Sequence, residues 1–401
     1  MIRVGFIIKD VNSWTGGFNY YKSLLSAIKK LGARREIEPV IFTAASEAAE
    51  VSVKLNLGFE CAGLSCLEGN SLLSYLGRAL KKTIGRNLVF EKALAAHKID
   101  VISHVSNAEA GNGLIMIGWI PDFQHIHLPD MFGPELLAYR NRTYMQMAEK
   151  ADAVILSSHD AAEDYKNFAP AFAAKGRVLN FAQSVAIDSF DAARHAAIKA
   201  AYNLPDKYFY IPNQFWKHKN HIVALKALKA LKDSGKTVPA IVFSGLSKDY
   251  RDAGYLNELE SYINDCGLKA NAIMLGLIDY QEVYYLMRYS AAVINPSLFE
   301  GWSSTVEECK AIDKDIILSN IKVHIEQAPA KAEYFDPHDA RGLAAILERY
   351  WFAPPAYDDG ALAAKLKAHE LKTIEFGENY QKIILSLAGR NKMNKTINGG
   401  I

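Results

Sequence analysis

Residues 295–310 constrain the fold of this chain more than any other stretch. The apolar run 291–294 before them predicts a buried strand, which Pro296 ends because proline cannot donate to a strand ladder. Three hydroxyl residues at 303–305 then offer helix N-caps, and a helical pattern follows. The stretch therefore predicts a strand, a loop and a helix N-terminus. At such a junction, unpaired backbone N–H groups and the helix dipole suit a phosphate.

Two glutamates, Glu300 and Glu308, bracket this junction with seven residues between them. Carboxylates accept paired hydrogen bonds from vicinal hydroxyls, so amides for phosphate and carboxylates for diols together suggest a nucleotide-sugar site. A structural interpretation fits the same residues. Ser304 with Glu307, or Thr305 with Glu308, matches a capping box, which would make one glutamate part of the helix cap. The pattern alone leaves both interpretations open.

The segment 299–308 resembles the E-x7-E motif of retaining glycosyltransferases of the GT-B fold, specifically glycosyltransferase family 4. The resemblance implies that Glu300 contacts hydroxyls of the donor sugar and that Glu308 holds the ribose. It also implies that the backbone of 301–304 meets the sugar and the diphosphate. Thr305 stands where many members carry proline. The donor-site residues implied in this stretch are Phe299, Glu300, Gly301, Trp302, Ser303, Ser304 and Glu308.

Composition limits the classes of function. The 401 residues are 50% hydrophobic, which allows sizeable cores, and the net charge of +2 does not predict nucleic-acid binding. The four cysteines show neither zinc-ligand spacing nor a disulfide framework, which favours a reduced, cytoplasmic setting. Residues 1–8 predict a first strand rather than a signal peptide, and no apolar run is long enough for a transmembrane helix.

Strands and helices alternate along the chain, which predicts parallel sheets covered by helices. With the resemblance, this indicates an α/β GT-B fold, in which two Rossmann-like domains face each other across an interdomain cleft. The expected parts are an N-terminal acceptor-binding domain (1–185), a linker (186–206), a C-terminal donor-binding domain (207–370), a helix crossing back to the first domain (371–390) and a disordered tail (391–401).

Two polar loops mark the first half. Gly16 and Gly17 end a loop after the first strand, and the resemblance implies that such a Gly-Gly loop approaches donor phosphate and acceptor. The pattern G-x-G-x-x-G is absent. The second loop, 121–129, follows a predicted strand, at the end where open α/β sheets bind ligands. It resembles the acceptor-side loop of family 4, which makes Asp122 the first candidate at the reacting centre and His125 the second.

A basic loop follows the first strand of the second half. Lys217 and Lys219 could neutralise a diphosphate near a helix N-terminus, or could simply be solvated. By resemblance, Gln214 occupies an arginine-like position and Lys219 the family's lysine position, so one of two cations is missing unless Lys217 replaces it. Asn213 in this loop and Gly276, in a loop that the resemblance places beside the nucleobase, complete the predicted donor site.

Residues 71–92 predict one long helix with an apolar stripe and five basic residues. A basic amphipathic helix can lie on an anionic membrane. The alternative is an ordinary surface helix whose apolar stripe packs on the sheet.

The resemblance implies a retaining glycosyltransferase that moves a hexose from a nucleotide-diphosphate sugar to a glycan or lipid-linked acceptor, and the likeness to polysaccharide-assembling members suggests mannose as that hexose. It implies no metal and no other cofactor, with Lys219 and backbone amides stabilising the leaving diphosphate and Asp122, His125 and Glu300 at the reacting centre. The expected location is cytoplasmic, with peripheral membrane contact. Two alternatives are an NAD-type two-domain oxidoreductase and a sugar-nucleotide-binding protein without catalysis.

Overall fold

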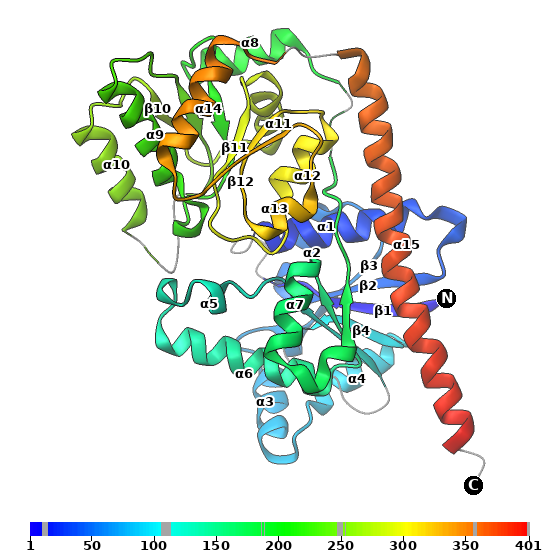
Figure 1. The fold of residues 1–401 in the computed structure, drawn as a ribbon. Coiled ribbons are helices and arrows are strands. Elements are labelled where there is room, and N and C mark those ends of the chain that lie inside the picture. Colours follow the sequence, from blue (N-terminus) through cyan, green and yellow to red (C-terminus); the bar gives the residue numbers. More distant parts are fainter. Residues whose placement is uncertain are drawn as a thin grey trace. The chain divides into compact units, whose positions relative to one another are not determined.

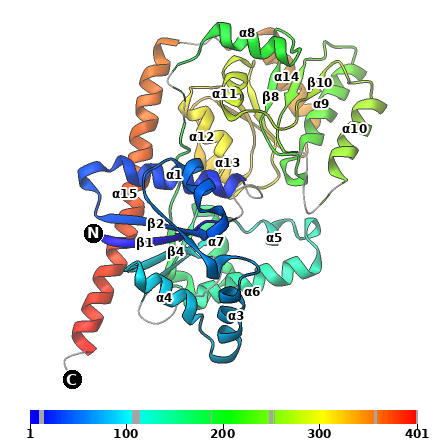
Figure 2. The same ribbon diagram turned by 180° about the vertical axis from the view of Figure 1, so that it is seen from behind.

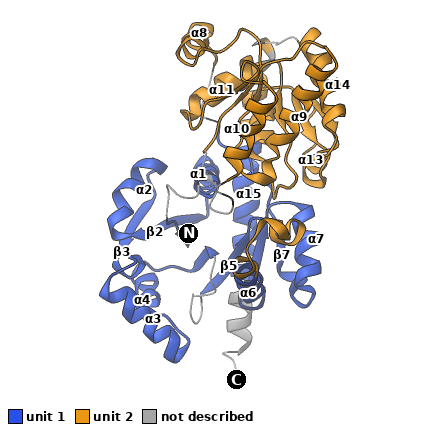
Figure 3. Cartoon of the chain, turned by 90° about the vertical axis from the view of Figure 1, so that its left-hand side faces the viewer, with its two compact units in different colours: residues 1–123, 138–184, 371–401 blue, residues 124–137, 185–370 orange. Residues whose placement is uncertain are grey.

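The structure is a computed structural model. It describes residues 1–9, 15–105, 114–185, 187, 189–246, 252, 254–355 and 359–398. The chain forms two compact units, each built on one parallel sheet (Figure 1). The first unit contains residues 1–123, 138–184 and 371–401, and the second contains residues 124–137 and 185–370 (Figure 3).

The first unit contains a seven-stranded sheet of order β3-β2-β1-β4-β5-β6-β7, with every neighbouring pair parallel. Its strands are β1 (Ile2–Ile7), β2 (Ile37–Ala44), β3 (Glu60–Leu64), β4 (Val101–Val105), β5 (Ile115–Ile120), β6 (Ala153–Leu156) and β7 (Gly176–Val178). Its helices are α1 (Thr15–Lys30), α2 (Ala48–Leu55), α3 (Leu72–Ile84), α4 (Leu88–Ala96), most of α6 (Pro134–Lys150), α7 (His159–Phe168) and the later part of α15 (Asp359–Asn398). The short 3-10 turns are Gly32–Arg34, Ala45–Glu47, Ser65–Leu67 and Pro170–Lys175.

Apolar side chains cover both faces of this sheet. One cluster joins β1 to α1 and to α15, with Phe376 and Tyr380 of α15 fully or almost fully buried. The other cluster joins β2, β4 and β6 to α4, α6 and α7. Because both faces are covered, the central strands are continuous apolar runs, as parallel sheets require.

The second unit contains a six-stranded parallel sheet of order β10-β9-β8-β11-β12-β13. Its strands are β8 (Phe209–Ile211), β9 (Ile241–Phe243), β10 (Ala272–Met274), β11 (Val293–Asn295), β12 (Ile316–Ser319) and β13 (Ala332–Phe335). Its helices are α5 (Gln124–His127), α8 (Ala192–Ala201), α9 (His221–Asp233), α10 (Tyr255–Asp265), α11 (Tyr280–Tyr289), α12 (Ser304–Ala311), α13 (Lys322–Gln327) and α14 (Ala340–Phe352), with 3-10 turns at Pro129–Met131 and Lys217–Lys219. Helices α9, α10 and α14 cover one face, and α8, α11 and α12 cover the other.

The prediction of two α/β units with parallel sheets is confirmed, but the predicted helix 71–92 is wrong. Two helices, α3 and α4, replace it, because Gly85 adopts the left-handed conformation (φ 74°) and ends α3. Asn87 then begins α4, since its side chain accepts a hydrogen bond from the Phe90 N–H. The glycine C-cap and the asparagine N-cap therefore end one helix and begin the next within three residues.

Four other local expectations differ from the structure. The segment 324–329, for which the sequence predicts a loop, lies partly in the helix α13. The helix expected at 371–390 extends over 359–398, and the tail expected to be disordered at 391–401 is helical to Asn398. Gly16 and Gly17 lie in the first turn of α1 rather than in the loop before it. Trp14, in the same predicted loop, lies outside the described residues.

Candidate active site

The loop between β11 and α12 has the predicted strand, loop and helix order. Strand β11 ends at Asn295, directly before Pro296, and α12 begins after Ser303. The Ser303 side chain is the N-cap, accepting from the Val306 N–H. Neither capping box considered from the sequence forms, because the N-cap is Ser303 and not Ser304 or Thr305. The capping explanation for Glu308 therefore does not apply.

Lys219 and Glu300 form an ion pair in the second unit, with 2.6 Å between Lys219 Nζ and Glu300 Oε1. Their side chains are 17% and 9% exposed, so the pair is largely shielded from water. Glu300 Oε1 also accepts from the Ser297 hydroxyl at 2.7 Å. The solvated-lysine alternative is thus wrong for Lys219. Lys217 is different, because it is half exposed and 3.3 Å from Asp252.

A buried polar network fixes the ends of β8 and β11 against α12. The Asn213 amide donates to Asn295 Oδ1 at 3.0 Å, and the Asn295 amide donates to the Ser303 hydroxyl at 2.8 Å. Thr305 donates to Asn213 Oδ1 at 3.2 Å. Satisfied networks of this kind make loop geometry specific, because any displacement leaves a buried polar group unpaired. Asn213 therefore helps to position the loop between β11 and α12.

Helix α13 also contacts this helix N-terminus, through Gln327. Its amide oxygen accepts from the Ser303 N–H at 3.1 Å, and its amide nitrogen donates to the Ser303 carbonyl and to Glu307. Ser303 was one of the amides predicted to meet a phosphate, but its N–H already has a protein partner. Sequence patterns gave no sign of Gln327, because it lies 24 residues along the chain from Ser303.

Glu308 is 4% exposed and accepts a hydrogen bond from the Tyr280 hydroxyl. Burial raises the pKa of Glu308 to about 7, although the Tyr280 hydrogen bond opposes that shift. Tyr280 is the first residue of α11, which Asp279 caps. The sequence did not single out Tyr280, because a tyrosine at a helix start has no distinctive pattern.

Two glycines shape the neighbouring loops. Gly276 has a φ of 70°, a conformation that other residues adopt only with strain. Gly245 leaves room for the backbone of the basic loop, because a Cβ there would lie 2.4 Å from the Asn213 carbonyl oxygen. The Gly245 N–H donates to the Gly276 carbonyl at 2.8 Å, which ties the two loops together.

His324 of α13 is fully buried near the ion pair. Its Nδ1 lies 2.9 Å from the Ser319 carbonyl, which makes Nδ1 the donor and leaves Nε2 as an acceptor. Burial lowers the pKa of His324, so the ring is neutral at pH 7, and the Glu300 carboxylate partly opposes this shift. His324 was predicted only as part of a loop, and its proximity to Glu300 could not be read from spacing.

The segment 124–137 belongs to the second unit and contains His125 and His127. His125 is 2% exposed and packs edge-on against Phe132. The His127 ring stacks on Phe299, with 5.1 Å between the ring centroids. Phe299 precedes Glu300, so this segment contacts the loop between β11 and α12.

Asp122 belongs to the first unit and pairs with Arg140 at 3.2 Å. Close by in sequence, β5 carries Trp119, whose ring stacks on Tyr20 at 4.3 Å. Tyr20 lies one turn after Gly16 and Gly17, so the first turns of α1 pack against the end of β5, directly before the 121–129 loop, through these rings.

Tyr20 also contacts a buried histidine that the sequence did not identify as special. The Tyr20 hydroxyl is 2.9 Å from His104 Nε2, and the Ser103 hydroxyl is 2.9 Å from His104 Nδ1. His104 has a φ of 57°, where the register of β4 against β5 shifts. Burial lowers its pKa to about 3, so this ring is neutral and structural.

The remaining predicted residues lie in or beside the same loops. Trp302 and Gln214 are half-buried, and Gly301 and Ser304 flank the Ser303 cap. Among the described residues, no three His, Cys, Asp or Glu side chains gather closely enough to hold a metal ion.

Comparison with known proteins finds a related family in the second unit. Residues 196–358 match the family model described as glycosyl transferases group 1. Over 228 residues the chain is 25% identical to the serotype-specific mannosyltransferase WbdA of Escherichia coli, covering 56% of this chain and 26% of that protein. It is also 25% identical over 151 residues to the O-antigen chain mannosyltransferase RfbU of Salmonella typhimurium, covering 38% of this chain and 40% of that protein. The chain thus spans less than half the length of these relatives.

Solved structures extend the similarity to the whole fold. The Anabaena protein HepE, determined with UDP and glucose, has a TM-score of 0.70 at 13% identity and covers 96% of this chain and 100% of its own. The lipopolysaccharide glycosyltransferase WaaG has a TM-score of 0.60 at 12% identity, covering 94% and 96%. The chain therefore has the GT-B fold, and its second unit carries the region matched by group 1 glycosyl transferases.

We predict that Lys219 and Glu300 stabilise the second unit as a coupled pair. In a double-mutant cycle of Lys219→Met and Glu300→Gln, each single change should lower the free energy of unfolding by roughly 2–3 kcal/mol, because it leaves the other charge shielded and unpaired. The coupling energy should be about 1–3 kcal/mol in urea unfolding. The exposed pair Lys236–Glu348 (2.7 Å) is the control, with an expected coupling below about 1 kcal/mol. Equal coupling in both pairs would contradict the prediction.

We predict a pH dependence of stability from Glu308. Its folded-state pKa of about 7 exceeds the ordinary value of 4.5, so the folded state holds more protons between these pH values. The free energy of unfolding should therefore fall as pH rises from 4.5 to 7, by up to about 3 kcal/mol. Urea unfolding of the wild type and Glu308→Gln across this range isolates the contribution. A wild-type-minus-variant difference that does not change with pH would mean that Glu308 is not shifted.

Proposed function

We propose that this chain is a retaining glycosyltransferase that uses a nucleotide-diphosphate sugar and builds a polysaccharide or glycoconjugate. The observation that carries the proposal is the Lys219–Glu300 pair beside the N-terminus of α12, on the fold and family region described above. It brings together a cation for phosphate, a carboxylate for sugar hydroxyls and a helix dipole. The names of WbdA and RfbU favour mannose as the transferred hexose.

In this proposal the donor lies on the second unit, where each residue has a separate task. Glu300 accepts hydrogen bonds from hydroxyls of the sugar, and Glu308 accepts from the ribose. Lys219, Gly301 and Ser304 stabilise the charge that develops on the leaving diphosphate, as preorganised donors do in other transfer reactions. The Ser303 N–H is left out of this set, because it donates to Gln327.

Retention follows if the acceptor hydroxyl attacks the face from which the diphosphate leaves, and the leaving phosphate takes the acceptor's proton. The bond formed joins the acceptor oxygen to the anomeric carbon, and the bond broken joins that carbon to the phosphate oxygen. No protein base is needed, which agrees with the pairing of Asp122 with Arg140 and with the burial of His125. Both residues are assigned to positioning, and the reaction is proposed to be independent of metal.

The acceptor is proposed to be a glycan or a lipid-linked saccharide, met by the first unit on the cytoplasmic side of a membrane. Helix α3 supplies the physical reason. Only Ser74 and Gly77 of this helix are buried, whereas Leu72 is 84% exposed and Leu76 48% exposed. The apolar stripe therefore faces outward, not toward the sheet as an ordinary surface helix would require.

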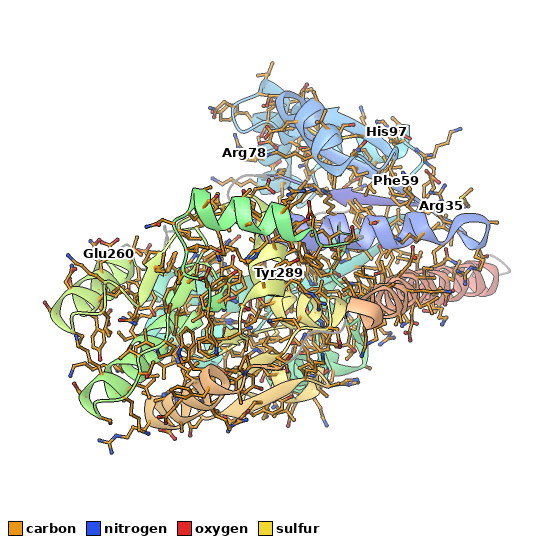
Figure 4. The ribbon with its side chains drawn as sticks, turned by 90° about the horizontal axis from the view of Figure 1, so that it is seen from above. Arg35, Phe59, Arg78, His97, Glu260 and Tyr289 are labelled. Carbon is orange, nitrogen blue, oxygen red and sulfur yellow. The ribbon has the colours of Figure 1, made fainter. Side chains whose placement is uncertain are left out.

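Basic residues flank this outward stripe. Arg78, Lys81 and Lys82 are exposed, and the Arg78 guanidinium lies over the Tyr75 ring at 4.5 Å. Figure 2 shows α3 at the end of the first unit, and Figure 4 labels Arg78 at that margin. Leucines beside cations fit an anionic bilayer. The leucine side chains enter the interface, and each Lys or Arg adds about 1 kcal/mol of binding free energy at the anionic surface. No helix among the described residues has the length and hydropathy of a membrane span.

We predict that Glu300→Gln lowers sugar transfer by about 100- to 1,000-fold, because the carboxylate's contact with the sugar is part of the reacting geometry. Thermal-shift screening of GDP-mannose, UDP-glucose and UDP-galactose identifies the donor. Release of nucleoside diphosphate with hexose-diphospholipid acceptors then measures transfer. Glu348→Gln, which removes a carboxylate from another lysine pair of this unit, is the control and should leave transfer unchanged.

The same experiment separates the alternatives. Stabilisation by NAD and by no sugar nucleotide would favour an oxidoreductase, whereas sugar-nucleotide binding without turnover on any acceptor would favour a binding protein. Wild-type transfer by Glu300→Gln would refute the role of Glu300.

We predict that the double variant Leu72→Ser/Leu76→Ser binds vesicles at least about tenfold more weakly, because each exposed leucine contributes about 1.5–3 kcal/mol when buried. Sedimentation with phosphatidylglycerol/phosphatidylethanolamine vesicles measures the binding. Phe352→Ser, which removes a 68% exposed phenylalanine from the second unit, is the control. Binding that is equal for all three proteins, or absent from the wild type, would contradict membrane contact through α3.

A further inference from the structure

Glu308 already has a hydroxyl on its carboxylate before any ligand binds. The donor is Tyr280, which comes from a different helix and lies 28 residues away in sequence. Glu308 is 4% exposed, whereas Tyr280 is 41% exposed. A largely buried carboxylate is thus satisfied by a tyrosine whose hydroxyl is buried with it, because burial raises the pKa of Tyr280 well above its ordinary value, while part of the residue borders solvent.

A tyrosine hydroxyl and a ribose hydroxyl offer the same group to a carboxylate, an O–H donor. A buried carboxylate without a donor is unfavourable, so an empty ribose site built on Glu308 needs a substitute hydroxyl. Tyr280 meets this need in the described structure. When ribose arrives, its hydroxyls can satisfy the carboxylate instead.

The surroundings allow Tyr280 to leave while Glu308 stays. Glu308 lies within α12, which is fixed at its start by Ser303 and Gln327. Tyr280 is the first residue of α11, and Asp279 caps that helix through the Gln281 N–H at 2.8 Å. The helix start is therefore held without the Tyr280 side chain. The Tyr280 ring is partly exposed, so it can rotate, and this rotation breaks the hydrogen bond to Glu308 and changes the contacts with Tyr284.

We propose that Tyr280 is a placeholder. Its hydroxyl donates to the Glu308 carboxylate until a ribose hydroxyl of the donor nucleotide binds and donates in its place. The inference rests on the proposed function, because it assumes that Glu308 is the ribose ligand. It adds a residue that sets nucleotide affinity. Ligand binding then exchanges one hydroxyl for another, and the loss of the Tyr280 hydrogen bond lowers the affinity for the nucleotide.

The test is nucleotide affinity of Tyr280→Phe at pH 8.5, measured by calorimetry with GDP, with UDP, and with their 2′,3′-dideoxy forms. The variant has no hydroxyl to displace, so it should bind the ribose forms about five- to tenfold more tightly than the wild type. The dideoxy forms should bind both proteins with affinities equal within about twofold, because they offer Glu308 no hydroxyl. Glu308→Gln should lose the preference for ribose.

Tyr262→Phe is the matched control, since Tyr262 lies on α10 of the same unit and packs against the apolar cluster shared by α9, α10 and α14. It should bind every nucleotide as the wild type does. Unchanged or weaker ribonucleotide binding by Tyr280→Phe, with a thermal unfolding transition that shows it folded, would overturn the placeholder alone. Failure of the wild type to bind either ribonucleotide would overturn the proposed function, and the placeholder with it.

Discussion

The shielded ion pair between Lys219 and Glu300 is the constraint on which the strand-end loops of the second unit depend. Removing two charges from water is favourable only if nearby groups complete their hydrogen bonds. Ser297 donates to the same carboxylate oxygen, and the Leu298 N–H donates to the His218 carbonyl. The Asn220 amide donates to the carbonyls of Pro296 and Pro337. The pair therefore holds its geometry because three loops are tied together around it.

Parts of this architecture follow from sequence because they depend on local chemistry. The strands are short apolar runs covered on both faces, and Pro296 and Ser303 fix where a strand stops and a helix begins. The positions of Glu300, Glu308 and Lys219 came from a family motif. Their mutual geometry did not, because Lys219 and Glu300 lie 81 residues apart and no periodicity reports that separation.

Other features were beyond sequence reasoning for a different physical reason. Helical periodicity shows that α3 has an apolar stripe, but it cannot show which face the rest of the fold covers, and here the small residues Ser74 and Gly77 are the buried ones. Gly85 and Asn87 end α3 and begin α4, but one glycine within a continuing apolar stripe does not by itself show that a helix stops there. Gln327 and Tyr280 are single polar residues whose partners lie on other helices.

Both glutamates of the proposed donor site are already paired with protein donors, and this has a consequence for ligand recognition. A free diphosphate that attracts Lys219 competes with Glu300 for the same ammonium, which weakens the attraction between the carboxylate and its cation. An intact sugar nucleotide avoids this cost, because its sugar hydroxyls can satisfy Glu300 while Lys219 turns to the phosphate. Under the proposed function, recognition of sugar and phosphate is therefore coupled through one ion pair. Transfer of the sugar removes the hydroxyls from Glu300, so the original pair can re-form and weaken the hold on the remaining nucleoside diphosphate.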